Sequence, residues 1–357
     1  MDEREHPDSG LLASQALAMA ESVRTIPPGF NFERALPTIS AREWRLHGGL
    51  LLLTIATTIL AGIVMMAPNL DAPEPPLTTP LDYLLYLPLS YLYWSAELFR
   101  YVMHNPHLIV QGATFSASLL AILFSHEMGH YLACRHYKVD ATLPYFIPAP
   151  PIFLAGTFGA FIKIRSAIPT RRALFDIGLA GPLAGFVVAL PVAVAGILTV
   201  GPPVAPQGTG GGLIFFNDPL LFRLLARLLG APLDPNTPIN PFYMAAWIGL
   251  LVTSLNLMPV GQLDGGHGTF AVFGARAHHH IGRFAFVTVV ILAILGFWWH
   301  NSPSGFLYAV LLGIMMRVPH PAPGVMEPLG TKRTIIALIT LLVFALCFWP
   351  FPISINN

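Results

Sequence analysis

Long apolar runs separated by short polar segments form the dominant pattern of this chain. A helix needs about 20 consecutive apolar residues to cross the hydrocarbon core of a bilayer, and most of the runs approach that length. A polar segment precedes the first run, and a loop rich in Pro, Asp and Glu follows it at residues 68–80. The pattern predicts about seven transmembrane helices, at residues 46–67, 114–134, 174–200, 241–259, 284–300, 305–317 and 334–351.

One further apolar segment, residues 81–103, contains Pro88, Glu97 and Arg100 together with tyrosines and a tryptophan that are typical of the membrane interface. Sixteen of the 19 Lys and Arg residues lie before the first run or in alternate loops. The positive-inside rule places those regions in the cytoplasm. The alternation holds only if residues 81–103 do not cross fully. We therefore predict a re-entrant or interfacial helix there, seven crossings and a cytoplasmic N-terminus.

Composition excludes several other classes of protein. Of the 357 residues, 54% are hydrophobic and 10% are charged, whereas a soluble domain is about 25% charged. With a net charge of only +1, a soluble enzyme, a disordered scaffold and a nucleic-acid binder all fit poorly. The two cysteines lie far apart in sequence and cannot form a disulfide framework. We expect an all-α polytopic membrane protein surrounded by the lipid bilayer, and the composition favours a bacterial inner membrane.

The second run contains the motif His126-Glu127-Met128-Gly129-His130. On a helix, residues four apart lie on one face, so the imidazoles of His126 and His130 can reach one ion while Glu127 stands beside them. A catalytic zinc has three protein ligands and an open position for water, and a neighbouring carboxylate can take the proton of that water. Ionisable groups inside an apolar span mark function by default, so we predict a zinc site.

Elimination narrows the residues that could be the third zinc ligand. Glu327 is the only glutamate after the motif, and it lies in a Pro-rich loop. His136 has the spacing of the motif HExxHxxGxxH, but Ala133 stands where that motif needs a helix-breaking glycine. Asp264 follows the run at 241–259. The distribution of Lys and Arg places the ends of this run and of the run with the two histidines on the cytoplasmic side, so Asp264 and the histidines are expected at the same membrane depth. Asp264 is therefore the best candidate.

The remaining polar residues have simpler interpretations. Asp176 follows Arg172 by four residues, a spacing that suits a local ion pair. Residues 278–280 are three histidines beside arginines and are expected to form a solvated loop. His267 is interpreted equally well as a neighbour of the zinc site or as a turn residue. Three glycines are interpreted as close helix packing: Gly178, Gly181 and Gly185.

Several motifs together resemble the site-2 protease family of intramembrane zinc metalloproteases, in its compact branch without an obvious PDZ domain. The resemblance covers roughly residues 110–275. It is carried by HEMGH (126–130), YFIPAP (145–150), GTFGAFIKIRS (156–166), RRALFDIGLAGPLAGF (171–186) and NLMPVGQLDGG (256–266).

The resemblance implies one zinc per chain, held by His126, His130 and Asp264, with Glu127 as the general base. It also implies that Asn256 holds the substrate backbone and that a hairpin near residues 156–164 lies in the membrane. Physical reasoning supports the hairpin, because an edge strand can pair with a substrate helix once that helix unwinds. The predicted substrate-binding residues are Asn256, Gly156 and Gly159.

The predicted function is hydrolysis of peptide bonds within or near transmembrane segments of substrate proteins. One alternative is a membrane-embedded zinc peptidase that cleaves soluble chains at the cytoplasmic face. Another is a non-catalytic transporter or chaperone-like relative. The predicted organisation is a flexible cytoplasmic tail (1–45), a first transmembrane helix with the interfacial segment (46–110), the zinc protease core (111–275) and C-terminal transmembrane helices (276–357).

Overall fold

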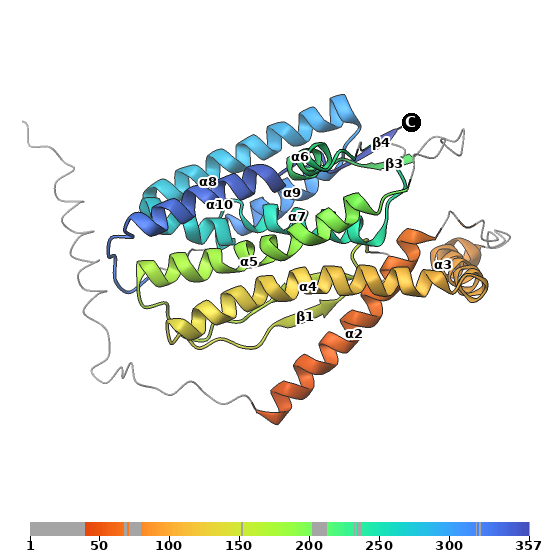
Figure 1. Ribbon diagram of the computed structural model, residues 1–357, viewed down its shortest axis with the longest axis horizontal. Coiled ribbons are helices and arrows are strands. Elements are labelled where there is room, and N and C mark those ends of the chain that lie inside the picture. Colours follow the sequence, from red (N-terminus) through yellow and green to blue (C-terminus); the bar gives the residue numbers. More distant parts are fainter. Residues whose placement is uncertain are drawn as a thin grey trace, which may run out of the picture. The chain divides into compact units, whose positions relative to one another are not determined.

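The computed structural model describes residues 40–67, 70, 80–150, 153–201, 213–231, 233, 237–318, 320 and 323–356. The predicted tail, up to residue 39, and most of the loop at 68–80 lie outside the described residues. The helices are α2 (Ala41–Met66), α3 (Pro80–His104), α4 (His107–His136), α5 (Arg171–Leu198), α6 (Leu220–Leu229), α7 (Pro241–Asn256), α8 (Asp264–His300), α9 (Ser304–Met315) and α10 (Thr331–Cys347) (Figure 1). Two antiparallel strand pairs complete it: β1 (Tyr145–Pro148) with β2 (Thr157–Phe161), and β3 (Leu213–Phe216) with β4 (Ile353–Asn356).

Four helices, α2, α4, α5 and α8, are long and apolar enough to cross a membrane, and α7 and α9 are shorter apolar helices. The prediction of a mostly helical, polytopic membrane protein is confirmed. The segment at 81–103 forms helix α3 with Pro88 inside it, and α3 is not among the four. The seven crossings and the re-entrant or interfacial placement of α3 stay predictions.

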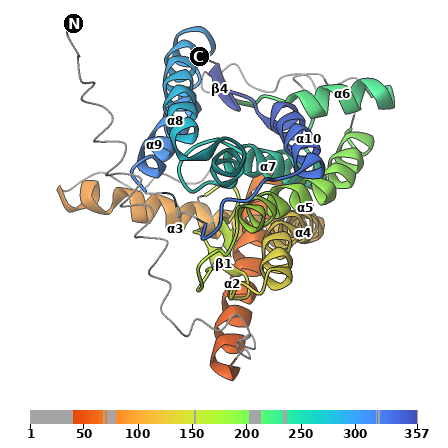
Figure 2. The same ribbon diagram turned by 90° about the vertical axis from the view of Figure 1, so that its left-hand side faces the viewer.

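Helix α7 lies in the middle of the helices in Figure 2, where α4 and α5 lie on one side of it and α8 and α10 on others. It packs against α4, α5 and α10. Its side chains are apolar on all sides, and Met244, Trp247 and Leu250 are fully buried. A helix of this kind needs neighbours on every face, so α7 forms the core on which α4 and α5 are placed.

Helices α2 and α4 cross at a pair of glycines. A Cβ at Gly112 of α4 would lie 2.5 Å from the carbonyl oxygen of Ile59, and a Cβ at Gly62 would lie 2.9 Å from Gly112 Cα. One turn away, the hydroxyls of Thr58 and Ser116 hydrogen-bond across the crossing at 2.6 Å. Small residues let helix backbones approach in lipid, and buried hydroxyls then find partners on the neighbouring helix.

Strands β1 and β2 form an antiparallel pair that contacts α2 and α4. The register joins Tyr145 to Phe161, and a bulge follows before Pro148 meets Thr157. The aromatic side chains of Phe158 and Phe161 on β2 are exposed. Strand β2 lies within the range near residues 156–164 where the sequence predicts a hairpin, but its partner β1 precedes that range. A hairpin in the membrane stays a prediction.

Helix α2 anchors this strand pair. The His47 imidazole hydrogen-bonds the carbonyl of Pro144, just before β1, at 3.0 Å. Gly156 lies directly before β2 with φ +65°, and a Cβ there would lie 2.4 Å from the carbonyl oxygen of Thr57. Only glycine combines this left-handed conformation with so close an approach to α2.

The pair β3–β4 and helix α6 have no counterpart among the predicted elements. Strand β3 pairs with β4, which lies far from it in the sequence, so no local pattern reveals the pairing. Helix α6 is short and amphipathic, and its Arg223 guanidinium stacks over the Trp349 ring at 4.2 Å. Leu228 of the same helix is 82% exposed.

The loop predicted around residues 278–280 is wrong, because α8 begins at Asp264 rather than near residue 284. His278 is helical and buried, and its Nδ1 contacts Thr269 Oγ1 at 2.9 Å. Hydropathy detects only the apolar part of a helix, so a polar extension beyond that part is easily assigned to a loop. Gly274, with φ 80° and ψ 173°, divides α8 into two helical pieces.

Arg171, the first residue of α5, donates hydrogen bonds to the last carbonyls of the first piece of α8. Its Nη2 donates to the carbonyl of Val272 at 2.9 Å, and its Nε donates to the carbonyl of Ala271. The last carbonyls of a helix lack internal partners and carry partial negative charge, so a cation there is stabilising. The helical piece that begins with Asp264 is thereby tied to α5.

The ion pair predicted between Arg172 and Asp176 is wrong. The Asp176 carboxylate instead accepts two hydrogen bonds from Arg333 of α10, at 2.6 and 2.8 Å, and one from the Tyr137 hydroxyl at the end of α4. Burial and the Asp176 carboxylate raise the pKa of Tyr137, which keeps its proton for this bond. Arg172 lies 3.7 Å from Glu327 instead. Three helices thus meet at Asp176, which spacing along one helix cannot reveal.

We expect Arg333→Ala to lower the free energy of unfolding by about 1.5–3 kcal/mol, because it removes a bidentate, half-buried charged hydrogen bond. The matched control is Arg172→Ala, whose pair with Glu327 is more exposed and should contribute about 1 kcal/mol or less. Thermal unfolding in detergent measures both variants. A melting temperature lowered more by Arg172→Ala than by Arg333→Ala would contradict this ranking.

Candidate metal centre

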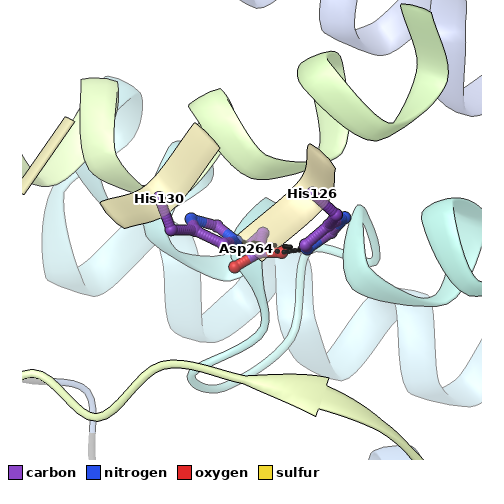
Figure 3. A group of neighbouring side chains, drawn as sticks. All are labelled: His126, His130 and Asp264. Atoms are coloured by element: carbon purple, nitrogen blue, oxygen red, sulfur yellow. Dashed lines mark hydrogen bonds and ion pairs between the residues drawn. The ribbon is translucent and has the colours of Figure 1, made fainter. Parts of the chain in front are cut away.

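Helix α4 supplies two imidazoles and a carboxylate from one buried turn. His126 and His130 lie four residues apart and point to the same side, as Figure 3 shows. His126, Glu127 and His130 are 4%, 6% and 8% exposed. Groups that ionise are rarely buried to this extent unless they bind a partner. The turn is therefore built to face another polar group.

Asp264, the first residue of α8, supplies that group. Its Oδ2 lies 3.3 Å from His126 Nε2 and 3.4 Å from His130 Nε2 (Figure 3). The two imidazole nitrogens themselves lie 3.1 Å apart. The ligand atoms of the three residues all fall within 4.8 Å of one another. Two segments more than 130 residues apart therefore converge on one point.

A backbone carbonyl fixes the orientation of His130. The Nδ1 of His130 lies 2.7 Å from the carbonyl oxygen of Ile177 on α5. Because a carbonyl only accepts, Nδ1 carries the proton and Nε2 presents its lone pair toward Asp264. Asn256 Nδ2, at the end of α7, lies 3.3 Å from His126 Nε2, the same nitrogen that faces Asp264.

This donor set fits a divalent cation. Two imidazole nitrogens and a carboxylate oxygen face one another at 3.1–3.4 Å, an arrangement that a shared cation between them would stabilise. Two nitrogen ligands and one oxygen ligand are typical of catalytic zinc, which keeps a fourth position for water. Among the described residues, this is the one group of His, Cys, Asp and Glu that meets the geometry of a metal site.

Glycines of α5 form the wall behind the imidazoles. A Cβ at Gly181 would lie 2.1 Å from His130 Nε2, and a Cβ at Gly185 would lie 3.2 Å from His126 Cβ. The helix packing predicted for these glycines is present, since α4 and α5 are in contact. The packing also leaves the space that His130 occupies, a consequence that the glycine spacing alone does not disclose.

The Glu127 carboxylate lies farther from His126 Nε2 than the Asp264 carboxylate does. Its Oε1 lies 4.0 Å from His126 Nε2, and its carboxylate interacts with the backbone N–H of Ile162, directly after β2. Strand β2 therefore ends beside the candidate metal centre. Gly159 of β2, with φ +99°, faces open space, whereas Gly156 is packed against α2.

Other residues considered from the sequence do not belong to this ligand group. His136 is exposed and stacks edge-on against Tyr137. Cys134 is buried in an apolar cluster. His267 is helical, and its Nδ1 lies 2.8 Å from His320 Nε2. The contribution of Ile177 was not predicted, because a backbone carbonyl has no sequence signature.

Comparison with known proteins relates the chain to metalloproteases. Residues 114–297, just over half of the chain, match the model of the family described as Peptidase family M50. The probable zinc metalloprotease EGY2, a chloroplastic protein of Oryza sativa subsp. indica, is 31% identical over 253 residues, 68% of this chain and 43% of that protein. The probable zinc metalloprotease EGY1, a chloroplastic protein of Arabidopsis thaliana, is 34% identical over 237 residues, 65% of this chain and 42% of that protein. The chain spans less than half the length of these curated relatives.

We expect Gly181→Ala to lower the affinity for zinc about 10–100-fold, the effect typical of disturbing the support of a metal ligand. The added Cβ would displace the His130 ring. Gly49→Ala on α2 is the matched control, because a Cβ there meets no atom within 4 Å. Zinc competition with a chelating dye measures both affinities. Equal affinities for the two variants would show that Gly181 does not hold the imidazole in place.

Proposed function

The chain belongs to peptidase family M50, the site-2 protease family that its motifs resemble, and we propose that it is an intramembrane zinc metalloprotease. The observation that carries the proposal is the meeting of His126, His130 and Asp264 within 4.8 Å. That meeting occurs between two helices long and apolar enough to cross a membrane. A site of this kind acts on peptide bonds that lie within the bilayer or at its edge.

We assign the three zinc ligands to His126 Nε2, His130 Nε2 and the carboxylate of Asp264. The Ile177 carbonyl supports this assignment, because it holds the proton of His130 on the nitrogen away from the ion. A purely structural zinc site would have four protein ligands. Three ligands and a nearby carboxylate that is not a ligand favour a catalytic site.

Glu127 is the proposed general base. When bound, zinc supplies a Lewis acid that polarises a carbonyl and lowers the pKa of water to about 7. Glu127 then takes the proton of the attacking water and returns it to the leaving amine. Its Oε1 lies 4.0 Å from His126 Nε2, close enough to share the site.

The proposed substrate is a transmembrane segment of another protein. Every backbone group of an intact helix is hydrogen-bonded, so the segment must unwind before its peptide bonds can be attacked. Strand β2 ends at the contact between Ile162 and Glu127, and its side chains Phe158 and Phe161 are exposed. An unwound segment that adds to β2 as a further strand would pass Glu127. Gly159 leaves room for that backbone, and Asn256, beside His126, would bond its carbonyls or N–H groups.

The orientation in the membrane follows from charge. Arg135 and Lys138 lie at the end of α4, and Arg171 and Arg172 at the start of α5, so the positive-inside rule places this side in the cytoplasm. The N-terminus and the metal centre then belong to the cytoplasmic half. The bacterial inner membrane stays a prediction from composition, and the relatives described above are chloroplastic.

The ligand assignment predicts which histidine and aspartate variants lose metal. Asp264→Ala should lose most of the single bound zinc, because two imidazoles alone bind weakly. His136→Ala, which removes an exposed histidine from the same helix, should keep it. Elemental analysis of the purified variants gives the zinc content. Loss of zinc from His136→Ala with retention in Asp264→Ala would refute the assignment.

The role of Glu127 predicts that Glu127→Gln keeps its zinc and its fold but loses activity. Removing a general base lowers the rate about 10²–10⁴-fold. Cleavage of a co-expressed membrane protein, followed as the product band, measures this loss. Unchanged processing by Glu127→Gln would exclude catalysis at this centre.

The substrate proposal predicts a dependence on helix stability. Replacing a Gly near the cleavage site of the substrate by Leu should slow cleavage several-fold, because unwinding then needs about 1 kcal/mol more. A matched Gly→Leu substitution in a loop of the same substrate is the control. Equal rates for all three substrates would favour a peptidase that cleaves already extended chains at the cytoplasmic face.

A further inference from the structure

The chain continues beyond β2 as an extended segment whose backbone groups alternate between two edges. The N–H of Thr142 donates to the carbonyl of Lys163 at 3.0 Å, and the N–H of Lys163 donates to the Thr142 hydroxyl at 3.0 Å. In an antiparallel ladder, the residues on either side of a bonded residue direct their N–H and C=O groups to the opposite edge. Ile162 and Ile164 therefore face away from Thr142, in agreement with the interaction of the Ile162 N–H with Glu127.

The edge that faces Glu127 is the one to which a substrate strand would add. On antiparallel addition, the carbonyl of Ile162 and the N–H of Ile164 would bond the added strand on either side of Lys163. Lys163 and the substrate residue opposite it would then form a pair without hydrogen bonds of its own. The Cα atoms of such a pair lie only about 4.5 Å apart, and its side chains are the closest across the two strands. Since Ile162 contacts Glu127, this substrate residue would lie one or two residues from the bond that is cleaved.

Lys163 carries a charge that nothing else in the described structure neutralises. Side chains at positions 161, 163 and 165 share one face, because side chains alternate along an extended chain. The ring of Phe161 stacks on that of Tyr145 with centroids 5.2 Å apart, and the guanidinium of Arg165 pairs with Glu43 at 2.6 Å. Lys163, between them, is exposed, and within the described part of the chain no carboxylate forms an ion pair with it. An ammonium group without a counter-charge therefore stands at the position closest to an added strand.

We propose that Lys163 determines substrate specificity by binding an acidic side chain, an Asp or Glu of the substrate that lies one or two residues from the cleaved bond. Opposite charges that face each other across two strands stabilise the pairing, and like charges destabilise it. The proposal rests on the proposed protease function and on strand addition to β2.

The direction of the chain gives the side on which the acidic residue lies. After Lys163 the chain leads to Arg171, the first residue of α5, at the end of the helix that the positive-inside rule places in the cytoplasm. Lys163 therefore lies on the cytoplasmic side of the contact between Ile162 and Glu127. The acidic residue is expected on the same side of the cleaved bond, where its charge is also less costly than deeper in the bilayer.

A peptide library measures the preference. Each peptide has an apolar core with Gly–Leu bonds and carries Asp, Asn or Lys at one position, and mass spectrometry identifies the bond that the purified, zinc-loaded protein cleaves in detergent. At one position within two residues of the cleaved bond, and on one side of it only, Asp should raise kcat/KM and Lys should lower it about threefold to tenfold relative to Asn. High salt should weaken this preference, because it screens exposed charges.

Charge reversal tests whether Lys163 causes the preference. Lys163→Glu should cleave the Lys peptide faster than the Asp peptide, and Lys163→Gln should cleave the three peptides at similar rates. The matched control is Lys332→Glu, which reverses an exposed lysine at the start of α10 and should keep the original order. A reversed order cannot come from misfolding, because the variant gains activity toward one peptide as it loses activity toward another.

The outcomes separate this inference from the proposed function. Equal cleavage of the Asp, Asn and Lys peptides by the unaltered protein, or an unchanged preference for Asp in Lys163→Glu, would overturn the inference and leave the protease function standing. An equal loss for all three peptides in Lys163→Gln, the result expected if Lys163 binds a lipid phosphate instead, would also overturn it. Failure of the unaltered protein to cleave any peptide of the library would contradict the proposed function itself.

Discussion

The hydrogen bond from His130 Nδ1 to the Ile177 carbonyl is the contact on which the rest of the site depends. It requires the backbone of α5 to lie against the imidazole of α4, and only a residue without a side chain at Gly181 permits that approach. It fixes the proton on the outer nitrogen, so the inner nitrogen faces Asp264. Asp176, one residue before Ile177, is held in turn by Arg333 and Tyr137. The position of the ligand is thus set by the packing of three helices.

Helix α8, which carries Asp264, is also held in place by α5. Its first residue is Asp264, and its first piece ends at Gly274, where Arg171 of α5 satisfies the free carbonyls. The same α5 that orients His130 therefore also holds the helical piece that begins with Asp264. The proposed substrate would meet this centre from β2, beside Glu127.

The sequence predicts those features that depend on local spacing. The pair His126 and His130 follows from the helical period, and the apolar runs give the long helices. Predicting Asp264 needs only the further assumption that its segment and the segment with the two histidines reach the same membrane depth. Features that depend on contacts between distant segments could not be predicted: the partner of Asp176 is 157 residues away, and β3 pairs with a strand near the other end of the sequence. The position of His278 was missed for another reason, since a polar helical extension has the composition of a loop.

The central claim is that one zinc ion lies between α4 and α8. Diffraction data from crystals of the purified protein, collected on both sides of the zinc absorption edge, would locate the ion directly. The account predicts one anomalous peak per chain, about 2.0–2.2 Å from His126 Nε2, His130 Nε2 and an Asp264 oxygen. A peak at other residues, or a peak bound by His126 and His130 with a ligand other than Asp264, would contradict it.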